Sequence, residues 1–211
     1  MRHRVHVDPV KSEMNGQGSR PSWRNRVNLA IYAPAGAGVI ALQAVILLAM
    51  GLPLICACGS IDFWHGNPSG PETSQHLTDW YTYTHVIHGF GFYLLLWLIL
   101  PKTSFGLRLA LAIGLEAGWE IVENTQFVMN RYRQSALARG YMGDSVVNSV
   151  FDTLATIVGF VFARIAPLWA SIAVVILIEL ILGYVIRDGL TLNVIQLIYP
   201  SETISNWQTG D

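Results

Sequence analysis

The sequence predicts an all-α protein, an integral membrane helical bundle of about five transmembrane helices. Of its 211 residues, 52% are hydrophobic and only 13% are charged, whereas an ordinary soluble domain has about 25% charged residues. In addition, 35 consecutive residues between Arg26 and Asp62 carry no formal charge, although about 20 apolar residues suffice to cross a bilayer. Composition and charge spacing together indicate a chain that folds in lipid.

Charge and cysteine content exclude other classes of protein. The net charge of -1 gives no basic surplus of the kind that nucleic-acid binding requires, so we expect no nucleic-acid partner. Cys56 and Cys58 are too few and too close together for a disulfide framework or a complete four-ligand zinc site. We interpret them as small packing residues. The membrane lipid bilayer is the expected partner of this chain.

The elements follow one another along the chain in a simple order. Residues 1–30 are polar and basic without apolar periodicity, which predicts a flexible cytoplasmic tail. The transmembrane domain, 31–189, has predicted spans near 33–55, 80–100, 107–128, 145–163 and 167–186. Residues 190–211 are expected to form a short interfacial C-terminal segment, because the apolar run 190–199 is too short to span. Pro101, Gly143 and Pro167 mark boundaries between spans.

The distribution of Lys and Arg predicts the orientation. With five spans, nine of the 13 Lys and Arg residues lie on the side of the N-terminus and four on the opposite side. The positive-inside rule then predicts a multi-pass protein of the bacterial cell inner membrane with a cytoplasmic N-terminus. Three of the outward residues, Arg131, Arg133 and Arg139, share one connection and need an explanation other than topology.

Three predicted spans carry a stripe of ionisable or amide side chains on one helix face. The stripes are His85 and His88 in the second span, Glu116, Glu120 and Glu123 in the third, and Asp144, Asn148 and Asp152 in the fourth. An acidic side chain near the bilayer centre costs about 2.5–3.5 kcal/mol on insertion scales, so these groups must face protein or water. At about 1.5 Å per residue, His88, Glu120 and Asp152 all lie about 12 Å below the outer surface. The stripes therefore predict one polar cavity that opens outward.

The chemistry of these side chains suggests three roles. The candidates for general acid and base catalysis are Glu120, Glu123, His88 and Asp152. The candidate ligands of a divalent metal ion are His85, His88, Glu116 and Glu120. The candidates for substrate binding are Arg131, Arg133, Asn148 and Asp144, because Arg forks suit the phosphate or carboxylate of an anionic lipid head group.

Structural interpretations of the same residues stand beside these roles. The buried Glu and His side chains also suit a network of structural ion pairs. Asp144, directly after Gly143, is also a candidate N-cap of the fourth helix. Glu179, alone in the fifth span, suits a structural partner as well as a functional group.

Three blocks of sequence carry a resemblance to a known family. They are Glu116-Ala-Gly-Trp-Glu-Ile-Val-Glu-Asn-Thr125, Arg131-Tyr-Arg133 and Gly143-Asp-Ser-Val-Val-Asn-Ser-Val-Phe-Asp152. Over residues 30–190 the chain resembles an uncharacterised family of alphaproteobacterial multi-pass inner-membrane proteins. More distantly, a His helix, a Glu-rich helix and an Arg loop before an Asp/Asn helix resemble the VanZ-like membrane proteins, which are linked to envelope and glycopeptide-antibiotic phenotypes. The resemblance implies location and architecture rather than a reaction.

Three functions remain open at the level of sequence. The first is an inner-membrane protein whose outward cavity binds, and in one version processes, an anionic envelope lipid or lipid-linked precursor. The second is a small proton-coupled transporter element in which the Glu stripe relays protons. The third is a structural or assembly subunit without catalysis. A hydrolytic or transfer reaction would need a metal-bound water as nucleophile, with Ser145 or Ser149 as weaker alternatives.

Overall fold

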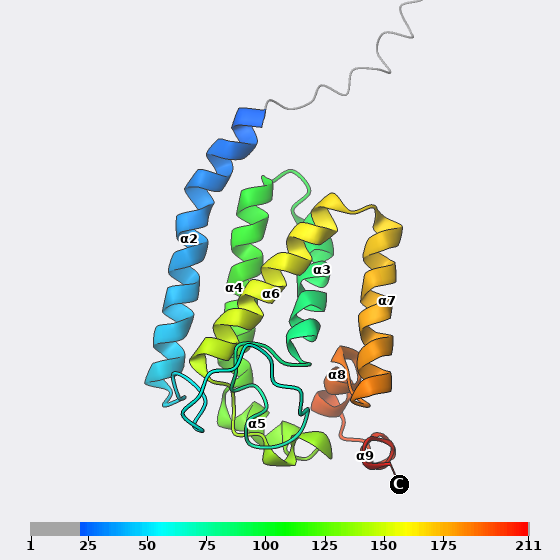
Figure 1. Cartoon of the computed structure of the whole chain (residues 1–211). Coiled ribbons are helices and arrows are strands. Elements are labelled where there is room, and N and C mark those ends of the chain that lie inside the picture. Colours follow the sequence, from blue (N-terminus) through cyan, green and yellow to red (C-terminus); the bar gives the residue numbers. More distant parts are fainter. Residues whose placement is uncertain (1–21, 211) are drawn as a thin grey trace, which may run out of the picture.

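Helices make up the ordered elements of this computed structural model, which describes residues 22–210 (Figure 1). Within that range the only extended pairing is one isolated bridge between His65 and Asp79. The predicted all-α class is confirmed.

Five long helices form the bundle: α2 (Ser22–Ala49), α3 (Thr82–Ile99), α4 (Phe105–Glu123), α6 (Val146–Ile165) and α7 (Leu168–Val185). Four of them contain a segment long and apolar enough to cross a membrane, namely Ala30–Ala49, Thr82–Ile99, Val146–Ile165 and Leu168–Val185. Helix α4 carries more charge, and it packs against α2, α3 and α6. Its residues Arg108, Glu116 and Glu120 are buried. The chain is therefore a helical membrane bundle in which α4 turns its charges inward.

The short helices gather at one end of the bundle. Figure 1 shows α5 (Gln126–Tyr132), α8 (Leu190–Ile198) and α9 (Glu202–Thr209) at the same end as the long segment 50–81, which we call the loop end. The 3-10 helix η1 (Leu137–Gly140) contacts α9 there. The α3–α4 and α6–α7 connections lie at the opposite end, where α2 begins. This alternation is the one that the predicted five-span topology requires.

Local sequence explains where the helices begin. The Ser104 and Ser145 hydroxyls accept the backbone N–H groups of Leu107 and Asn148, which caps α4 and α6. Ser145, rather than Asp144, is thus the N-cap of α6, so the capping interpretation of Asp144 was wrong. Pro167 stands at the N-cap of α7, as the predicted boundary implies.

The two ends of the chain differ from the predicted segments. Residues 1–21 of the predicted tail lie outside the described residues, and α2 begins at Ser22, so the remainder of that tail is helical. The predicted C-terminal segment contains α8 and α9. Its interfacial position and the domain boundaries stay predictions.

Cys56 and Cys58 form a disulfide, so their interpretation as packing residues was wrong. A turn closed by the Gly59 N–H and the Cys56 carbonyl brings the two Cα atoms to 5.1 Å, within the range that a disulfide spans. Composition gave no sign of this pairing, because it depends on the local turn.

Two glycines allow α3 and α6 to cross at backbone contact. A Cβ atom at Gly89 would lie 2.2 Å from the Thr156 carbonyl oxygen, and one at Gly159 would lie 2.0 Å from the Val86 carbonyl oxygen. Beside this crossing, the Thr156 hydroxyl donates to the His85 carbonyl at 2.8 Å. Close approach of the two helices therefore places the histidine face of α3 against the aspartate face of α6.

Candidate functional site

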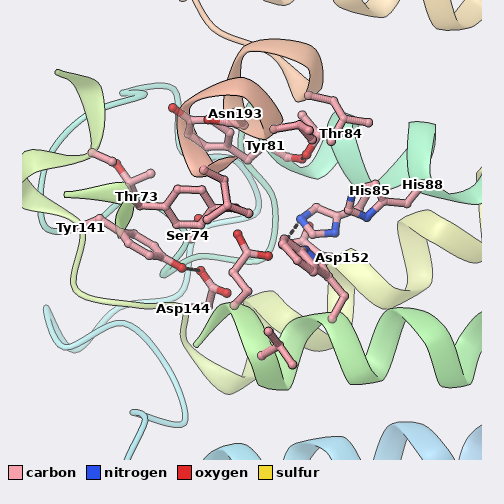
Figure 2. A pocket seen from close by; sticks show the side chains of 18 of the residues that line it. Thr73, Ser74, Tyr81, Thr84, His85, His88, Tyr141, Asp144, Asp152 and Asn193 are labelled. Atoms are coloured by element: carbon pink, nitrogen blue, oxygen red, sulfur yellow. Dashed lines mark hydrogen bonds and ion pairs between the residues drawn. The ribbon is translucent and has the colours of Figure 1, made fainter. Parts of the chain in front are cut away.

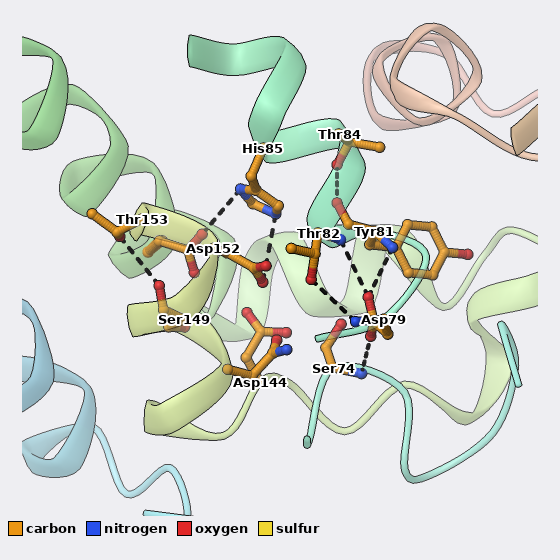
Figure 3. Close-up of polar contacts among 12 residues, drawn as sticks. Ser74, Asp79, Tyr81, Thr82, Thr84, His85, Asp144, Ser149, Asp152 and Thr153 are labelled. Carbon is orange, nitrogen blue, oxygen red and sulfur yellow. Dashed lines mark hydrogen bonds and ion pairs between the residues drawn. The ribbon is translucent and has the colours of Figure 1, made fainter. Parts of the chain in front are cut away.

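His85 lies at the centre of the buried polar residues. It comes from α3 and is buried between carboxyl groups of α4 and α6. Its Nδ1 atom lies 2.5 Å from Glu116 Oε1 and 3.2 Å from Glu120 Oε1, and its Nε2 atom lies 3.8 Å from Asp152 Oδ2. Figure 3 shows the ring with Asp152 on one side and the polar start of α3 on the other. Three helices thus converge on one imidazole.

His88 adds a second imidazole one helical turn further along α3. Its Nδ1 atom lies 3.1 Å from Glu116 Oε2, so Glu116 joins both histidines. The His88 ring also meets Trp119 edge to face, with 6.2 Å between the ring centroids. Packing against Trp119 fixes the orientation of His88.

Asp79 fixes the beginning of α3 and hence the position of His85. Its buried carboxylate accepts the backbone N–H groups of Ser74, Tyr81 and Thr82 at 2.8, 2.7 and 3.3 Å (Figure 3). Burial raises the pKa of Asp79 against the lowering effect of these three hydrogen bonds. The residue therefore positions α3 and the loop end relative to each other.

The arrangement supplies donor atoms for a metal ion. One donor atom each from His85, His88 and Glu116 lie within 4.8 Å of one another, and the same holds for His85, Glu120 and Glu123. Within residues 22–210, the fully buried Glu120 carboxylate accepts no hydrogen bond, and its 3.2 Å ion pair with His85 uses the Nδ1 atom that lies closer to Glu116. A buried carboxylate without donors is costly, and a cation removes that cost. Imidazole and carboxylate ligands suit Zn²⁺ and similar divalent ions.

A cavity of about 490 Å³ opens beside these groups at the loop end (Figure 2). His85, His88 and Asp152 line it, and Glu116 and Glu120 are not among its lining residues. Apolar side chains of α3, α4 and α8 form much of its wall, including Phe92, Leu115, Trp119, Val122 and Leu197. Of the described residues that line the cavity, none is Lys or Arg. The cavity thus combines a His and carboxylate floor with apolar walls.

Asp144 and Glu123 line another part of the same cavity. The Asp144 carboxylate accepts the Asn124 side-chain N–H at 2.6 Å and the Tyr141 hydroxyl at 2.7 Å. Burial raises the pKa of Asp144, although both hydrogen bonds lower it. Burial and Asp144 raise the pKa of Tyr141 well above 10, so this hydroxyl stays a donor at neutral pH.

Sequence reasoning missed the residues that complete this part of the cavity. Tyr132 lies in the short helix α5 and Tyr141 directly after η1, so no helical spacing selects them, whereas Asn124 ends α4 four residues after Glu120. Burial and the neighbouring Glu123 carboxylate raise the pKa of Tyr132 well above 10. Gly143 has φ of 94°, a left-handed conformation that glycine adopts readily, and it directs Asp144 towards Asn124. The Gly143-Asp144 pair and the spacing of Asn124 from Glu120 are sequence signals for this arrangement.

Three of the four residues predicted to bind substrate lie outside the cavity lining. Arg131 donates to the carbonyls of Leu197 and Ile198, each at 2.8 Å, and Arg133 donates to the Tyr141 carbonyl at 2.7 Å. These bonds give Arg131 and Arg133 a structural role that does not depend on topology, since they satisfy carbonyls at the end of α8 and at Tyr141. The Asn148 side-chain N–H donates to the His76 carbonyl at 2.8 Å. Of the four, only Asp144 lines the cavity.

Glu179 has a structural role, which is one of the two interpretations that its isolated place in the sequence allowed. Its carboxylate accepts the backbone N–H groups of Leu190 and Thr191 at 2.8 and 3.1 Å, which satisfies the first turn of α8. With Arg131 at the other end, two charged side chains hold α8 as one wall of the cavity.

Asp188 lies two residues before α8, and its burial leads us to predict that the stability of the fold depends on pH. Burial raises the pKa of its carboxyl from 3.8 to about 6, partly offset by hydrogen bonds from Gly189 and Tyr81. Because the folded state holds this proton more tightly, its contribution to stability is complete below about pH 4 and is lost as pH rises through 6. We expect the melting temperature in detergent to fall over this interval, and Asp188→Asn to flatten the fall. An unchanged slope in Asp188→Asn would contradict the assignment.

Comparison with known proteins gives the family. The family model described as "Protein of unknown function (DUF2585)" matches residues 47–210, a range that contains every residue of the site described above. The chain is 51% identical over 172 residues to a UPF0314 protein of Paracoccus denitrificans, covering 82% of this chain and 89% of that protein. It is 46% identical over 193 residues to a UPF0314 protein of Rhizobium meliloti, covering 92% and 97%.

A UPF0314 protein of Brucella anthropi is 48% identical over 194 residues, covering 92% of this chain and 97% of that protein. No solved structure matches the chain. The predicted resemblance to an uncharacterised alphaproteobacterial family is confirmed, and the resemblance to the VanZ-like proteins stays a prediction. By the extent of these matches, the chain belongs to the DUF2585 family, whose relatives carry the name UPF0314.

Proposed function

We propose that this protein holds a divalent metal ion at His85, His88, Glu116 and Glu120 and uses it to bind and process the anionic head group of an envelope lipid or lipid-linked precursor. One observation carries the proposal. Two histidines and two fully buried carboxylates from adjacent helices meet behind a cavity with apolar walls. A purely apolar bundle would have no need of these groups.

The neighbouring acid groups support a division of roles. With a cation on the Nδ1 side of His85, the Nε2 proton faces Asp152, 3.8 Å away. A carboxylate that accepts the second ring N–H of a metal-ligating histidine orients it, so Asp152 would act as a positioning residue if this ion pair tightened to a hydrogen bond. Glu123 and Asp144 line the cavity, where they would exchange protons with a bound substrate. The metal ion would supply Lewis-acid activation of a phosphoryl or carbonyl oxygen.

Charge and wall chemistry suggest the substrate class. Because the described lining residues include no Lys or Arg, the metal ion would be the positive group that meets an anionic head. The apolar side chains of α3, α4 and α8 suit an acyl or isoprenoid chain beside it. This assignment replaces the arginine-based recognition that the sequence suggested.

The opposite end of the bundle favours binding over transport. There Leu96, Ala112 and Phe160 are buried in an apolar cluster, with Tyr93 and Phe105 packed against it. A proton-coupled carrier needs a polar path to both faces, and this cluster stands between the histidines and the far end of α3. The buried apolar cluster therefore favours the lipid-binding function over the proton-coupled carrier.

The orientation proposed for the site is towards the outer side of the inner membrane. Its support is the distribution of Lys and Arg together with the Cys56–Cys58 disulfide at the loop end, since disulfides persist in the bacterial periplasm and rarely in the cytosol. Reporter fusions after Gly59 and after Arg164 test it. We expect an outward signal at Gly59 and an inward signal at Arg164, and the reverse pattern would contradict the orientation.

The function is tested by the composition of the purified protein. We expect about one divalent metal ion per chain in the oxidised, detergent-purified protein, together with an anionic lipid identified by mass spectrometry. Both should be lost from Glu116→Gln and retained by Glu202→Gln, a change at an exposed residue of α9. Equal metal and lipid content in the two variants would refute the proposal and favour a structural subunit.

A further inference from the structure

A second group of side chains that could hold a metal ion lies in the segment that joins α2 to α3. Cys56, Cys58, Glu72 and His76 each offer one donor atom, and the four atoms all lie within 4.8 Å of one another. None of these four residues lines the cavity. Two sulfurs, one imidazole nitrogen and one carboxylate oxygen provide four donors, the number that a tetrahedral zinc site uses.

We propose that these four residues form a redox-controlled site for a thiophilic divalent cation such as Zn²⁺. The site binds the cation when Cys56 and Cys58 are thiols, and it is closed when they form the disulfide seen here. The two states exclude each other because the thiolate is the metal ligand and a disulfide sulfur is not. This site is independent of the cavity and of the function proposed for it.

Burial makes the four ligands unequal in a way that suits entry from solvent. His76 and Cys56 are only 1% and 3% exposed, whereas Cys58 and Glu72 are exposed. A cation or a reductant therefore reaches Cys58 and Glu72 first, while the other two ligands are held in place. In addition, the Cys58 backbone N–H lies 3.1 Å from Cys56 Sγ and donates to it, which favours a thiolate at Cys56 after reduction.

The contacts of His76 hold its ring in place and indicate which ring nitrogen carries the proton. Its Nδ1 atom accepts the Asp62 backbone N–H at 3.1 Å, and its Nε2 atom lies 3.3 Å from Glu72 Oε2. This pattern assigns the proton of the neutral ring to Nε2, facing Glu72. A cation between His76 and Glu72 replaces that proton, the ring then carries its proton on Nδ1, and Nδ1 gives up the hydrogen bond that it accepts from the Asp62 backbone N–H. The Asp62 carboxylate, with Oδ2 3.8 Å from Nδ1, becomes the acceptor that orients the ligating ring.

The site opens when thiol–disulfide exchange reduces the Cys56–Cys58 disulfide. A dithiol reductant supplies two electrons and two protons, the Cys56–Cys58 bond breaks to give two thiols, and the reductant closes to its own disulfide. Binding of the cation then releases both thiol protons. The cation in turn protects the thiolates from oxidation back to the disulfide, so metal and redox state control each other.

The test compares the two redox states of the full chain in detergent. Protein reduced with dithiothreitol and desalted without oxygen is expected to bind one more Zn²⁺ per chain than oxidised protein, and Co²⁺ in its place should give thiolate charge-transfer absorption. Cys58→Ser and the exposed Glu72→Gln should lose or weaken this extra ion, and Asp62→Asn should weaken its binding about 10-fold or more. Glu120→Gln, a change in the cavity, should retain it.

Two results would overturn this second site. One is equal zinc content in the reduced and oxidised proteins. The other is an extra ion that persists in Cys58→Ser or lacks the thiolate absorption. Because Glu72 is exposed, Glu72→Gln tests the site even if a cysteine variant folds poorly. Loss of the extra ion from Glu120→Gln would assign that ion to the cavity and would contradict this site as well.

Discussion

Glu120→Gln is expected to abolish cellular function and to weaken divalent metal binding by about 100-fold or more, while the protein stays folded in the membrane. Glutamine keeps the size of the side chain but removes the charge that offsets the cost of burying a cation. Loss of an outer partner of a metal site already costs about 10- to 100-fold in affinity, and loss of a ligand should cost at least as much. The variant therefore separates chemistry from packing.

Two measurements check this expectation. Titration of the oxidised protein with Zn²⁺ or Mn²⁺ gives the affinity, and rescue of a deletion strain under envelope stress gives the function, with membrane abundance checked by immunoblot. Glu202→Gln is the matched control, because it makes the same chemical change at an exposed position of α9. Glu179→Gln is a poorer control, since Glu179 holds the start of α8. Full rescue with unchanged affinity would make the buried residues a structural network.

Gly89→Ala is expected to destabilise the fold by about 3 kcal/mol, at the upper end for overpacking, and to impair metal binding as well. Its Cβ atom would meet backbone atoms of Thr156 and Phe160 at 2.2 and 2.6 Å, so α3 and α6 would have to move apart. That movement would carry His85 away from Asp152, whose Oδ2 atom lies 3.8 Å from the ring Nε2 atom.

Gly91→Ala provides a close control on the same helix. A Cβ atom at Gly91 meets nothing within 4 Å, and Ala favours helix over Gly by about 1 kcal/mol, so this variant should be neutral or slightly more stable. Thermal unfolding in detergent and metal titration of the two variants give the comparison. Similar stability for both would show that the α3–α6 contact tolerates separation.

The membrane class and the convergence of the stripes followed from the sequence for a physical reason. Exposing a charge to lipid is costly, so the ionisable residues of the spans are expected to face the inside of the bundle. Helical periodicity then indicates which of these residues share a face. This reasoning placed His85 and His88 opposite Glu116 and Glu120, and Asp152 beside them, as the distances now show.

The rest of the site could not be predicted, because it depends on contacts outside the periodic helices. Arg131 and Arg133 bind backbone carbonyls, and a sequence does not show which carbonyls lack partners. Tyr141 reaches Asp144 only through the fold of the α5–α6 connection. Similarly, the contact of Asn148 with the His76 carbonyl joins residues 72 positions apart, which no local pattern reveals.

X-ray absorption spectroscopy of the oxidised, zinc-loaded protein tests the central claim most directly. With the thiols closed as a disulfide, we predict one zinc ion per chain in a shell of nitrogen and oxygen atoms at about 2.0–2.2 Å, with imidazole scattering from two histidines that falls to one in His88→Ala. A shell of water oxygens without imidazole, or a spectrum that His88→Ala leaves unchanged, would contradict a metal centre at His85, His88, Glu116 and Glu120.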